Sequence, residues 1–221
     1  MTQSEENYIK TIFLLEEAGK GKILTNAIAE KLETKASSVT DMIQKLEEKG
    51  IVTYKKYQGV NLTSAGKRAA LALVRKHRLW ETFLVNRLNF GWDEVHEIAH
   101  QLEHIQSESL VEKLDAFLGF PETDPHGEPI PGGDGKVQLK TPYLINLSEA
   151  KPGEKYILEA VLYPSDVFLR YLNKVGLGIG SELQVQKIED YDLSMEILIL
   201  GNSCFLSNET TQNLMVKHYG E

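Results

Sequence analysis

Apolar residues recur at helical spacing through the first half of the chain. The stripe formed by Tyr8, Ile12 and Leu15 predicts a first helix over residues 7–17, because residues three and four apart share one helix face. Gly19 marks its end. The same spacing predicts further helices over residues 26–32, 36–49, 64–86, 92–106 and 107–118.

The second and third predicted helices form a helix-turn-helix motif. Thr25 is a suitable N-cap for the second helix. A short turn over residues 33–35 leads into the third helix, whose buried stripe is Val39, Ile43 and Leu46. Two short helices joined by a tight turn are typical of DNA-binding modules.

A basic hairpin follows this motif. Residues 51–63 contain two β-prone runs around Gln58 and Gly59, a pair typical of turns. The segment 1–64 is therefore predicted to be a winged helix, in which the second helix of the motif enters the major groove and the hairpin contacts the DNA backbone. The candidate DNA-binding residues are Lys35, Ser37, Ser38, Thr40, Asp41, Gln44, Lys55, Lys56 and Tyr57.

The pattern changes after residue 119. Residues 120–142 are rich in Pro and Gly and predict a linker, or a loop held by other contacts. Beyond them, short runs predict strands at 155–161, 183–189, 194–200 and 204–206, with one helix at 166–174. The fold class is thus mainly α with a small C-terminal β-barrel, divided into a winged helix (1–64), a helical domain (65–119), the linker (120–142) and the barrel (143–221).

Composition and charge refine this division. The chain has 221 residues, of which 42% are hydrophobic, enough for one or two cores. The net charge of −8 argues against nucleic acid, but residues 1–78 carry 14 Lys and Arg against 9 Asp and Glu. The basic character therefore lies at the front of the chain, where a DNA-binding module would have to be. A single cysteine, Cys204, and the lack of a signal peptide or apolar span predict a cytoplasmic protein without a membrane partner.

Histidines cluster in the helical domain. His96, His100 and His104 are four residues apart with Glu103 beside the last two, and His77 precedes Glu81 by one helical turn. Single helical histidines are usually metal-free, but a group of imidazoles and carboxylates on one face is an arrangement that binds a divalent cation. The sequence predicts a metal site.

Two other interpretations remain open. Residues 96–100 match the His-Glu-x-x-His spacing of metallohydrolases, with Glu97 or Glu103 as base. A hydrolase leaves the basic winged helix unexplained, however, so we expect a protein that is not an enzyme and has no small-molecule substrate. The second alternative is a winged-helix protein that needs no metal.

Three motifs together resemble the diphtheria toxin repressor family of metal-dependent transcriptional regulators. They are residues 75–79 (Arg-Lys-His-Arg-Leu), the segment from Val95 to His104, and residues 126–131 (His-Gly-Glu-Pro-Ile-Pro) before an SH3-like tail. The resemblance covers essentially the whole chain. It implies a homodimer that binds palindromic operator DNA when loaded with Fe(II) or Mn(II) and represses metal-uptake genes.

The resemblance also implies two metal sites. The principal site would use Asn7, His100, Glu103 and His104. The other would use His77, Glu81 and His96, completed by Asp166 of the tail or by Asp124 and His126 of the preceding loop. Relatives usually have Met or Asp at the position of Asn7 and Cys or a carboxylate at that of His100. The manganese branch often has a carboxylate where this chain has Lys10, which argues against a two-manganese cluster.

The types of ligand and their places along the chain predict which metal binds and what binding does. Imidazoles, carboxylates and an amide without a thiolate suit Mn(II) or Fe(II), although Zn(II), Co(II) and Ni(II) can substitute in vitro. Coordination would tie the first helix to the dimerisation region and so fix the spacing of two winged helices. Apolar residues that predict either a dimer contact or an internal core are Leu84, Leu88, Val95, Leu102 and Leu110.

Overall fold

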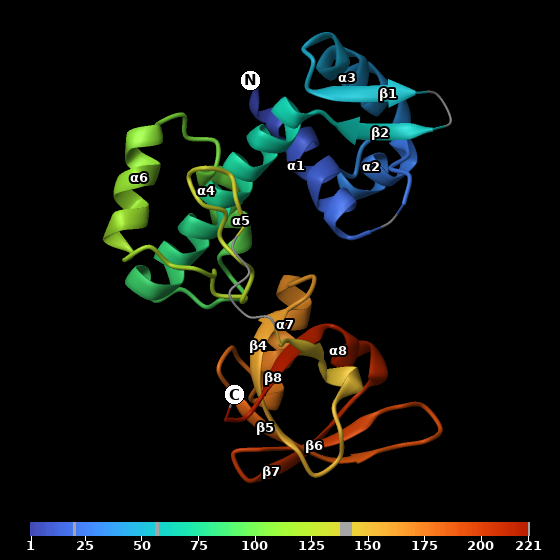
Figure 1. The fold of residues 1–221 in the computed structure, drawn as a ribbon, viewed down its shortest axis with the longest axis vertical. Helices are drawn as coiled ribbons and strands as arrows, with labels where there is room; N and C mark the ends of the chain where they lie inside the picture. Colours follow the sequence, from blue (N-terminus) through green and yellow to red (C-terminus); the bar gives the residue numbers. More distant parts are fainter. Residues whose placement is uncertain (20, 56–57, 138–142, 221) are drawn as a thin grey trace. The chain divides into compact units, whose positions relative to one another are not determined.

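The structure is a computed structural model that describes residues 1–19, 21–55, 58–137 and 143–220. The chain divides into two compact units. Figure 1 labels the helices and strands along the chain. The first unit comprises Met1–His77, His100–Ser109 and Pro131–Val137. The second comprises Arg78–Ala99, Leu110–Ile130 and Gln138–Glu221.

The first unit contains the winged helix. Its elements are α1 (Gln3–Glu17), α2 (Thr25–Lys31), α3 (Ala36–Glu48), β1 (Val52–Lys55) and β2 (Gly59–Leu62). The two strands pair antiparallel from Val52 opposite Leu62 to Lys55 opposite Gly59. This confirms the predicted helix-turn-helix and hairpin. Lys56 and Tyr57, predicted at the hairpin tip, lie outside the described residues.

Capping explains where the first two helices begin. Thr2 and Glu5 form a capping box, so α1 starts four residues before its predicted start. The prediction of Thr25 as N-cap is wrong by one position, because the extended residue before α2 is Leu24, which makes no side-chain cap. α3 begins at Ala36 as predicted.

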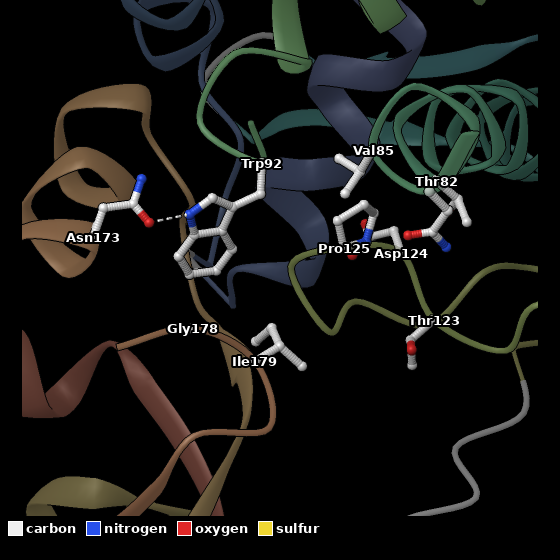
Figure 2. A pocket seen from close by; sticks show the side chains of 10 residues that line it. Thr82, Val85, Trp92, Thr123, Asp124, Pro125, Asn173, Gly178 and Ile179 are labelled. Carbon is white, nitrogen blue, oxygen red and sulfur yellow. Dashed lines mark hydrogen bonds between the residues drawn. The ribbon is translucent and has the colours of Figure 1, made fainter. Parts of the chain in front are cut away.

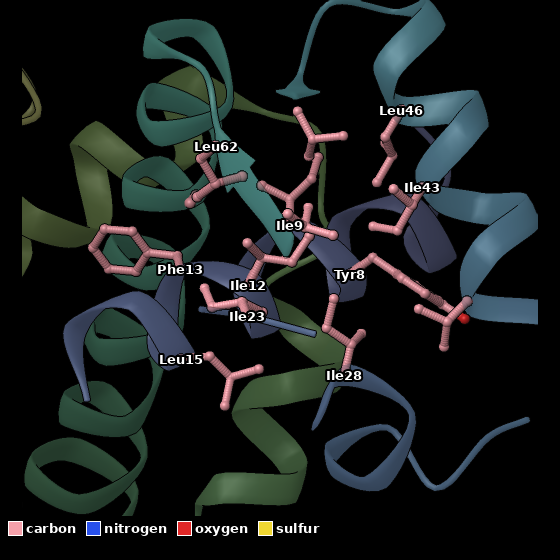
Figure 3. Packing of buried hydrophobic residues seen from close by; sticks show 14 of the residues in the cluster. Tyr8, Ile9, Ile12, Phe13, Leu15, Ile23, Ile28, Ile43, Leu46 and Leu62 are labelled. Carbon is pink, nitrogen blue, oxygen red and sulfur yellow. The ribbon is translucent and has the colours of Figure 1, made fainter. Parts of the chain in front are cut away.

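One apolar core joins α1 to the helix-turn-helix and the hairpin (Figure 3). Ile9 and Ile12 of α1 are fully buried, as are Ile28 of α2 and Ile43 and Leu46 of α3. Each such side chain contributes about 1.5–3 kcal/mol through burial. The packing fixes α1 against α3, the second helix of the helix-turn-helix motif.

Three helices follow: α4 (Ser64–Leu88), α5 (His96–Leu102) and α6 (Glu108–Phe117). The predicted helix over 92–106 is wrong at both ends. Its start forms a turn, in which the N–H of Glu94 donates to the Gly91 carbonyl. Its end turns back at Leu102, whose carbonyl accepts from the N–H of Ile105, so Glu103 and His104 lie in the turn after α5.

The tail is a six-stranded antiparallel sheet with strand order β3-β8-β4-β5-β6-β7. The strands are β3 (Ile145–Asn146), β4 (Lys155–Val161), β5 (Glu182–Ile188), β6 (Met195–Ile199), β7 (Asn202–Leu206) and β8 (Leu214–His218). Its helices are α7 (Asp166–Val175), α8 (Asn208–Gln212) and the 3-10 turn Leu147–Glu149. Among the described residues no pairing joins β3 to β7, so a closed barrel is not shown.

Two further observations bear on the predictions. Leu84 and Val95 are buried together with Ala99 and belong to an internal core, whereas Leu88 is half exposed. Within the described part of the chain, no helix has the length and apolar character needed to cross a bilayer.

Candidate metal centre

Glu103 is the hub of a buried cluster in the first unit, which we call the first centre: Glu6, His100, Glu103 and His104. Its Oε2 lies 2.6 Å from both Lys10 Nζ and His77 Nδ1. Its Oε1 lies 3.1 Å from His100 Nδ1 and 3.9 Å from His104 Nε2. Burial alone would raise the pKa of Glu103, but the hydrogen bonds from His100 and His77 and the charge of Lys10 hold that pKa well below its ordinary value. Glu103 is therefore an ionised ligand candidate.

Glu6 joins this centre although the sequence did not predict it. Its Oε2 lies 2.6 Å from His104 Nδ1, and its Oε1 accepts a 2.8 Å hydrogen bond from Gln106 Nε2. A carboxylate that binds one ring nitrogen of a histidine orients the ring and leaves the other nitrogen for a metal. The available signal was helical spacing: Glu6 and Lys10 lie one turn apart on α1, so both face Glu103 and His104.

The first centre has the composition of a metal site. His100, Glu103 and His104 each offer one ligand atom, and these atoms lie within 4.8 Å of one another. The rings of His100 and His104 meet edge to face, with centroids 5.4 Å apart. Two imidazoles and one carboxylate are a donor set for a first-row divalent cation.

A second centre lies in the second unit and consists of Glu81, His96, Asp124 and His126. Glu81, Asp124 and His126 are all buried, with one ligand atom from each within 4.8 Å of the others. Glu81 Oε1 lies 3.2 Å from His96 Nδ1, and Glu81 Oε2 lies 3.7 Å from His126 Nδ1. His77, the remaining predicted ligand, lies one turn before Glu81 on α4.

Hydrogen bonding fixes the orientation of His126. Its Nε2 lies 2.8 Å from the Trp92 carbonyl oxygen, and because a carbonyl only accepts, Nε2 carries a proton. Nδ1 therefore faces Glu81. Although burial alone would lower the pKa of His126, the Glu81 carboxylate raises it to about 9. Without a metal the ring therefore carries a proton on each nitrogen and compensates part of the carboxylate charge, and a cation would bind Nδ1 by displacing its proton.

The surroundings of Asp124 oppose its charged form, in contrast to those of His126. Its Oδ1 accepts from the backbone N–H groups of His126 and Glu128, at 2.8 and 3.0 Å. Burial, together with the carboxylates of Glu81 and Glu128, raises the pKa of Asp124 to about 7. Arg78 offsets part of this charge, since its Nη2 lies 3.1 Å from Glu128 Oε1.

Two contacts hold the loop that carries Asp124 and His126. Arg78 Nη1 donates to the Pro129 carbonyl at 2.6 Å. The Val161 N–H, at the end of β4, donates to the His126 carbonyl at 2.9 Å. Between them, Gly127 has φ +84°, and a Cβ there would lie 2.0 Å from the Glu159 carbonyl oxygen. These contacts fix residues 126–129 of the Pro- and Gly-rich segment as an ordered loop.

Three buried side-chain atoms of the described residues have no hydrogen-bond partner: Asn7 Oδ1, Asp124 Oδ2 and His126 Nδ1. All three belong to residues predicted as metal ligands. Buried polar atoms without partners cost about 1–3 kcal/mol each, and such atoms are rare in native proteins. Oxygen and imidazole nitrogen donors are ligands that Mn(II) and Fe(II) accept, so these residues fit a divalent cation.

The structure does not bring Asp166 to either centre. It is exposed in the first turn of α7, where Ser165 caps the helix, and it is absent from the metal-type clusters of the described residues. Instead, Asn173 of α7 contacts the helical region: its Oδ1 accepts from Trp92 Nε1 at 2.7 Å and its Nδ2 donates to Asp93 at 3.1 Å. Figure 2 shows this contact beside a cavity of about 460 Å³ that Asp124 also lines.

The predicted DNA-binding side chains of the reading helix are mostly exposed. Thr40 is the exception, because it is half-buried and its hydroxyl donates to the Ala36 carbonyl at 3.0 Å. The exposed residues are Lys35, Ser37, Ser38, Asp41, Gln44 and, on β1, Lys55.

Comparisons with known proteins agree with this geometry. Residues 1–60 match the profile of the iron dependent repressor N-terminal DNA binding domain, residues 63–132 that of the iron dependent repressor metal binding and dimerisation domain, and residues 145–218 that of the FeoA domain. The FeoA match confirms the predicted SH3-like tail.

Similar proteins extend this match. The chain is 36% identical to the iron-dependent repressor IdeR of Mycobacterium leprae over 132 residues, which is 60% of this chain and 57% of that protein. It is 30% identical to the diphtheria toxin repressor of Corynebacterium diphtheriae over 175 residues, 79% of this chain and 74% of that one.

Solved structures cover nearly the whole chain. A manganese-dependent transcriptional repressor in complex with manganese aligns with 97% of this chain and 100% of its own, with 37% identity and a TM-score of 0.85. The structure of the manganese regulator SloR covers 99% of this chain and 100% of its own, with 33% identity and a TM-score of 0.76. With both iron dependent repressor profiles and these relatives matched along its length, the chain belongs to the diphtheria toxin repressor family of metal-dependent regulators.

Proposed function

We propose that this chain is a transcriptional repressor that binds palindromic operator DNA as a homodimer when loaded with Mn(II) or Fe(II), and so controls metal-uptake genes. The observation that carries the proposal is that three buried atoms without a hydrogen-bond partner all belong to residues predicted as ligands. The relatives support it, since they are named as iron- or manganese-dependent repressors.

The first centre would hold one cation through His100, Glu103 and His104, with Glu6 orienting His104 and Asn7 offering its amide oxygen. A bound cation supplies positive charge and a fixed arrangement of donors. The ammonium of Lys10 already neutralises the second oxygen of Glu103, at 2.6 Å. This tethered positive charge favours one cation at the first centre over a two-metal cluster.

The second centre would hold another cation through Glu81, His96, Asp124 and His126. Two buried carboxylates and a histidine form a site whose charge is compensated only in part by Arg78. Its loop is attached to β4 of the tail, so occupancy would hold the tail against the helical region of the same unit.

Metal choice follows from the donors. Neither centre contains a thiolate among the described residues, and imidazole with carboxylate suits Mn(II) and Fe(II). Zn(II), Co(II) and Ni(II) bind such sites in vitro. A structural neighbour, ScaR, is named with bound Zn²⁺ and with bound Cd²⁺.

DNA would be read by α3. Ser37 and Ser38 in its first turn suit phosphate contacts, and the exposed side chains of Asp41 and Gln44 suit contacts with base edges. Lys55 on β1 suits the DNA backbone, and Lys56 and Tyr57 remain candidates from the sequence.

The homodimer would use apolar side chains of the helical region. Phe117 is 61% exposed, although Phe83 and Arg87 pack against its ring. Leu88 and Phe120 are also exposed. Exposed large apolar residues in a domain described as the dimerisation domain are suited to a subunit contact.

A metallohydrolase is not favoured by the geometry. The two histidines of the His-Glu-x-x-His spacing have different partners, since His96 contacts Glu81 and His100 contacts Glu103. Glu97, the nominated base, is exposed. The matched relatives are repressors and not enzymes.

The test is a selection from random-sequence DNA by Mn(II)-loaded protein, followed by gel-shift titration of the selected fragment with and without a chelator. We expect chelation to weaken binding by about fivefold or more. His104→Ala should abolish this metal dependence and leave the fold intact by circular dichroism. His218→Ala, in strand β8 of the tail, is the matched control. Equal binding before and after chelation would refute the proposal.

A further inference from the structure

The first turn of α1 carries two adjacent buried carboxylates that point to different elements. Glu5 Oε1 lies 2.8 Å from Lys45 Nζ and 2.7 Å from Lys49 Nζ, at the C-terminal end of α3. Glu6, the next residue, contacts His104 of the first centre. One turn of helix therefore touches both the reading helix and the candidate metal ligands.

Glu5 is held firmly in this position. Its side chain is fully buried, and its Oε2 accepts the N–H of Thr2 at 3.1 Å as part of the capping box. Two lysine ammonium groups and one backbone N–H therefore surround this carboxylate.

The two lysines form a clamp around this charge. Lys45 lies in the last turn of α3, and Lys49 is its C-cap, four residues on and so on the same face. Apolar packing of α1 on α3 is non-directional, whereas two ion pairs from one fixed oxygen restrict rotation and sliding of α3.

We propose that Glu5 is a positioning residue that couples occupancy of the first centre to the orientation of the DNA-reading helix. The inference rests on the proposed function, because it needs a cation at His100, Glu103 and His104. Any ordering of Glu6 and Asn7 by that cation acts on Glu5 directly, because consecutive residues in one hydrogen-bonded turn move together. Glu5 carries this ordering to Lys45 and Lys49.

The experiment is hydrogen exchange measured by mass spectrometry on the full chain, with and without Mn(II). In the wild type, Mn(II) should slow exchange both around residues 100–106 and in α3. In the Glu5→Gln variant, Mn(II) should still slow exchange around residues 100–106. The slowing in α3 should fall to less than half of its wild-type size. Gln is accepted at this position of a capping box, so the variant removes the ion pairs and keeps the helix start.

Controls separate the possible outcomes. Glu17→Gln removes the same charge from an exposed site of α1 and should behave as the wild type. Lys45→Gln with Lys49→Gln cuts the link from the other side and should reproduce Glu5→Gln. If α3 responds fully to Mn(II) in both link variants, the inference is overturned although the proposed function stands. If Mn(II) does not change exchange around residues 100–106 of the wild type, both the inference and the proposed function are refuted.

Discussion

Glu5 and Asp124 are both buried carboxylates, yet their surroundings shift their pKa values in opposite directions. Glu5 is held by two lysines and a backbone N–H, which lower its pKa to about 2. Asp124 is buried with one oxygen lacking a hydrogen-bond partner and with Glu81 and Glu128 nearby, which raise its pKa to about 7. The surroundings of Glu5 therefore favour its ionised form, whereas those of Asp124 oppose it.

The first prediction concerns Glu5 and acid. A lowered pKa adds stability that is present above the unfolded pKa of 4.5 and is lost as the pH falls toward 2. Glu5→Gln should therefore lower the free energy of unfolding by about 1 kcal/mol at pH 6, a modest value because both lysines are half exposed. The difference should disappear near pH 2. Urea unfolding across this range tests it, and a difference that grows in acid contradicts it.

The second prediction concerns Asp124. Asp124→Asn keeps an oxygen for the His126 and Glu128 N–H groups and removes the charge that repels Glu81. We expect the metal-free protein to gain about 1–3 kcal/mol in unfolding free energy at pH 8. Mn(II) should stabilise the variant less than the wild type in a thermal unfolding assay. Asp192→Asn, an exposed aspartate of the tail, is the control, and a destabilised metal-free Asp124 variant is the contrary result.

At the level of elements, the helices and main strands were predictable because their apolar residues have clear periods. Strand β8 was missed although it lies between β3 and β4. Its five residues include Lys217 and His218, which hide the apolar alternation of Leu214 and Val216. Helix α5 proved shorter than its pattern, because turns at Gly91 and Leu102 redirect the chain.

The sequence predicted which residues are candidate metal ligands better than it predicted which of them lie together. Regular spacing placed His96, His100 and His104 on one face, but His96 turns to Glu81 while the other two gather at Glu103. Glu6 was not predicted, because its role depends on tertiary contact with His104 across nearly a hundred residues. Local periodicity carries no information about such distant pairs.

The loop before the tail gives the third prediction. Any side chain at Gly127 meets the Glu159 carbonyl and the Ala160 Cα, and its φ of +84° is strained for other residues. Gly127→Ala should displace the loop and weaken metal binding at the second centre by about 10- to 100-fold. Equilibrium dialysis with Mn(II) should then show one tight site per chain where the wild type has two. Gly133→Ala, where a Cβ meets nothing within 4 Å, is the matched control.

At the scale of the whole molecule, basic and acidic regions are divided along the chain. Residues 1–78 carry 14 Lys and Arg against 9 Asp and Glu, whereas the remainder carries 10 against 23. A dimer would bring two of these basic front segments to one DNA, while the acidic remainder disfavours nonspecific binding elsewhere. We therefore expect pairing of subunits to strengthen DNA binding.

The fourth prediction tests that pairing. Phe117→Glu places a charge on the exposed apolar surface of the helical region and should convert the dimer to a monomer in light scattering after size exclusion. Binding to the selected DNA should weaken at least tenfold, because one head loses the contribution of the other. Tyr191→Glu, at a tail position that is 98% exposed, should change neither property. A Phe117→Glu variant that remains dimeric contradicts the proposed surface.

The stacking of Trp92 on His126 has an optical consequence. The centroids of the Trp92 indole and the His126 imidazole lie 6.0 Å apart. The backbone carbonyl of Trp92 accepts a hydrogen bond from Nε2 of His126. Paramagnetic Mn(II) quenches the emission of a fluorophore at such range, whereas diamagnetic Zn(II) does not. The chain has only two tryptophans, so Trp92→Phe isolates the other one. The protein thereby contains a built-in fluorescent reporter for loading of the second centre.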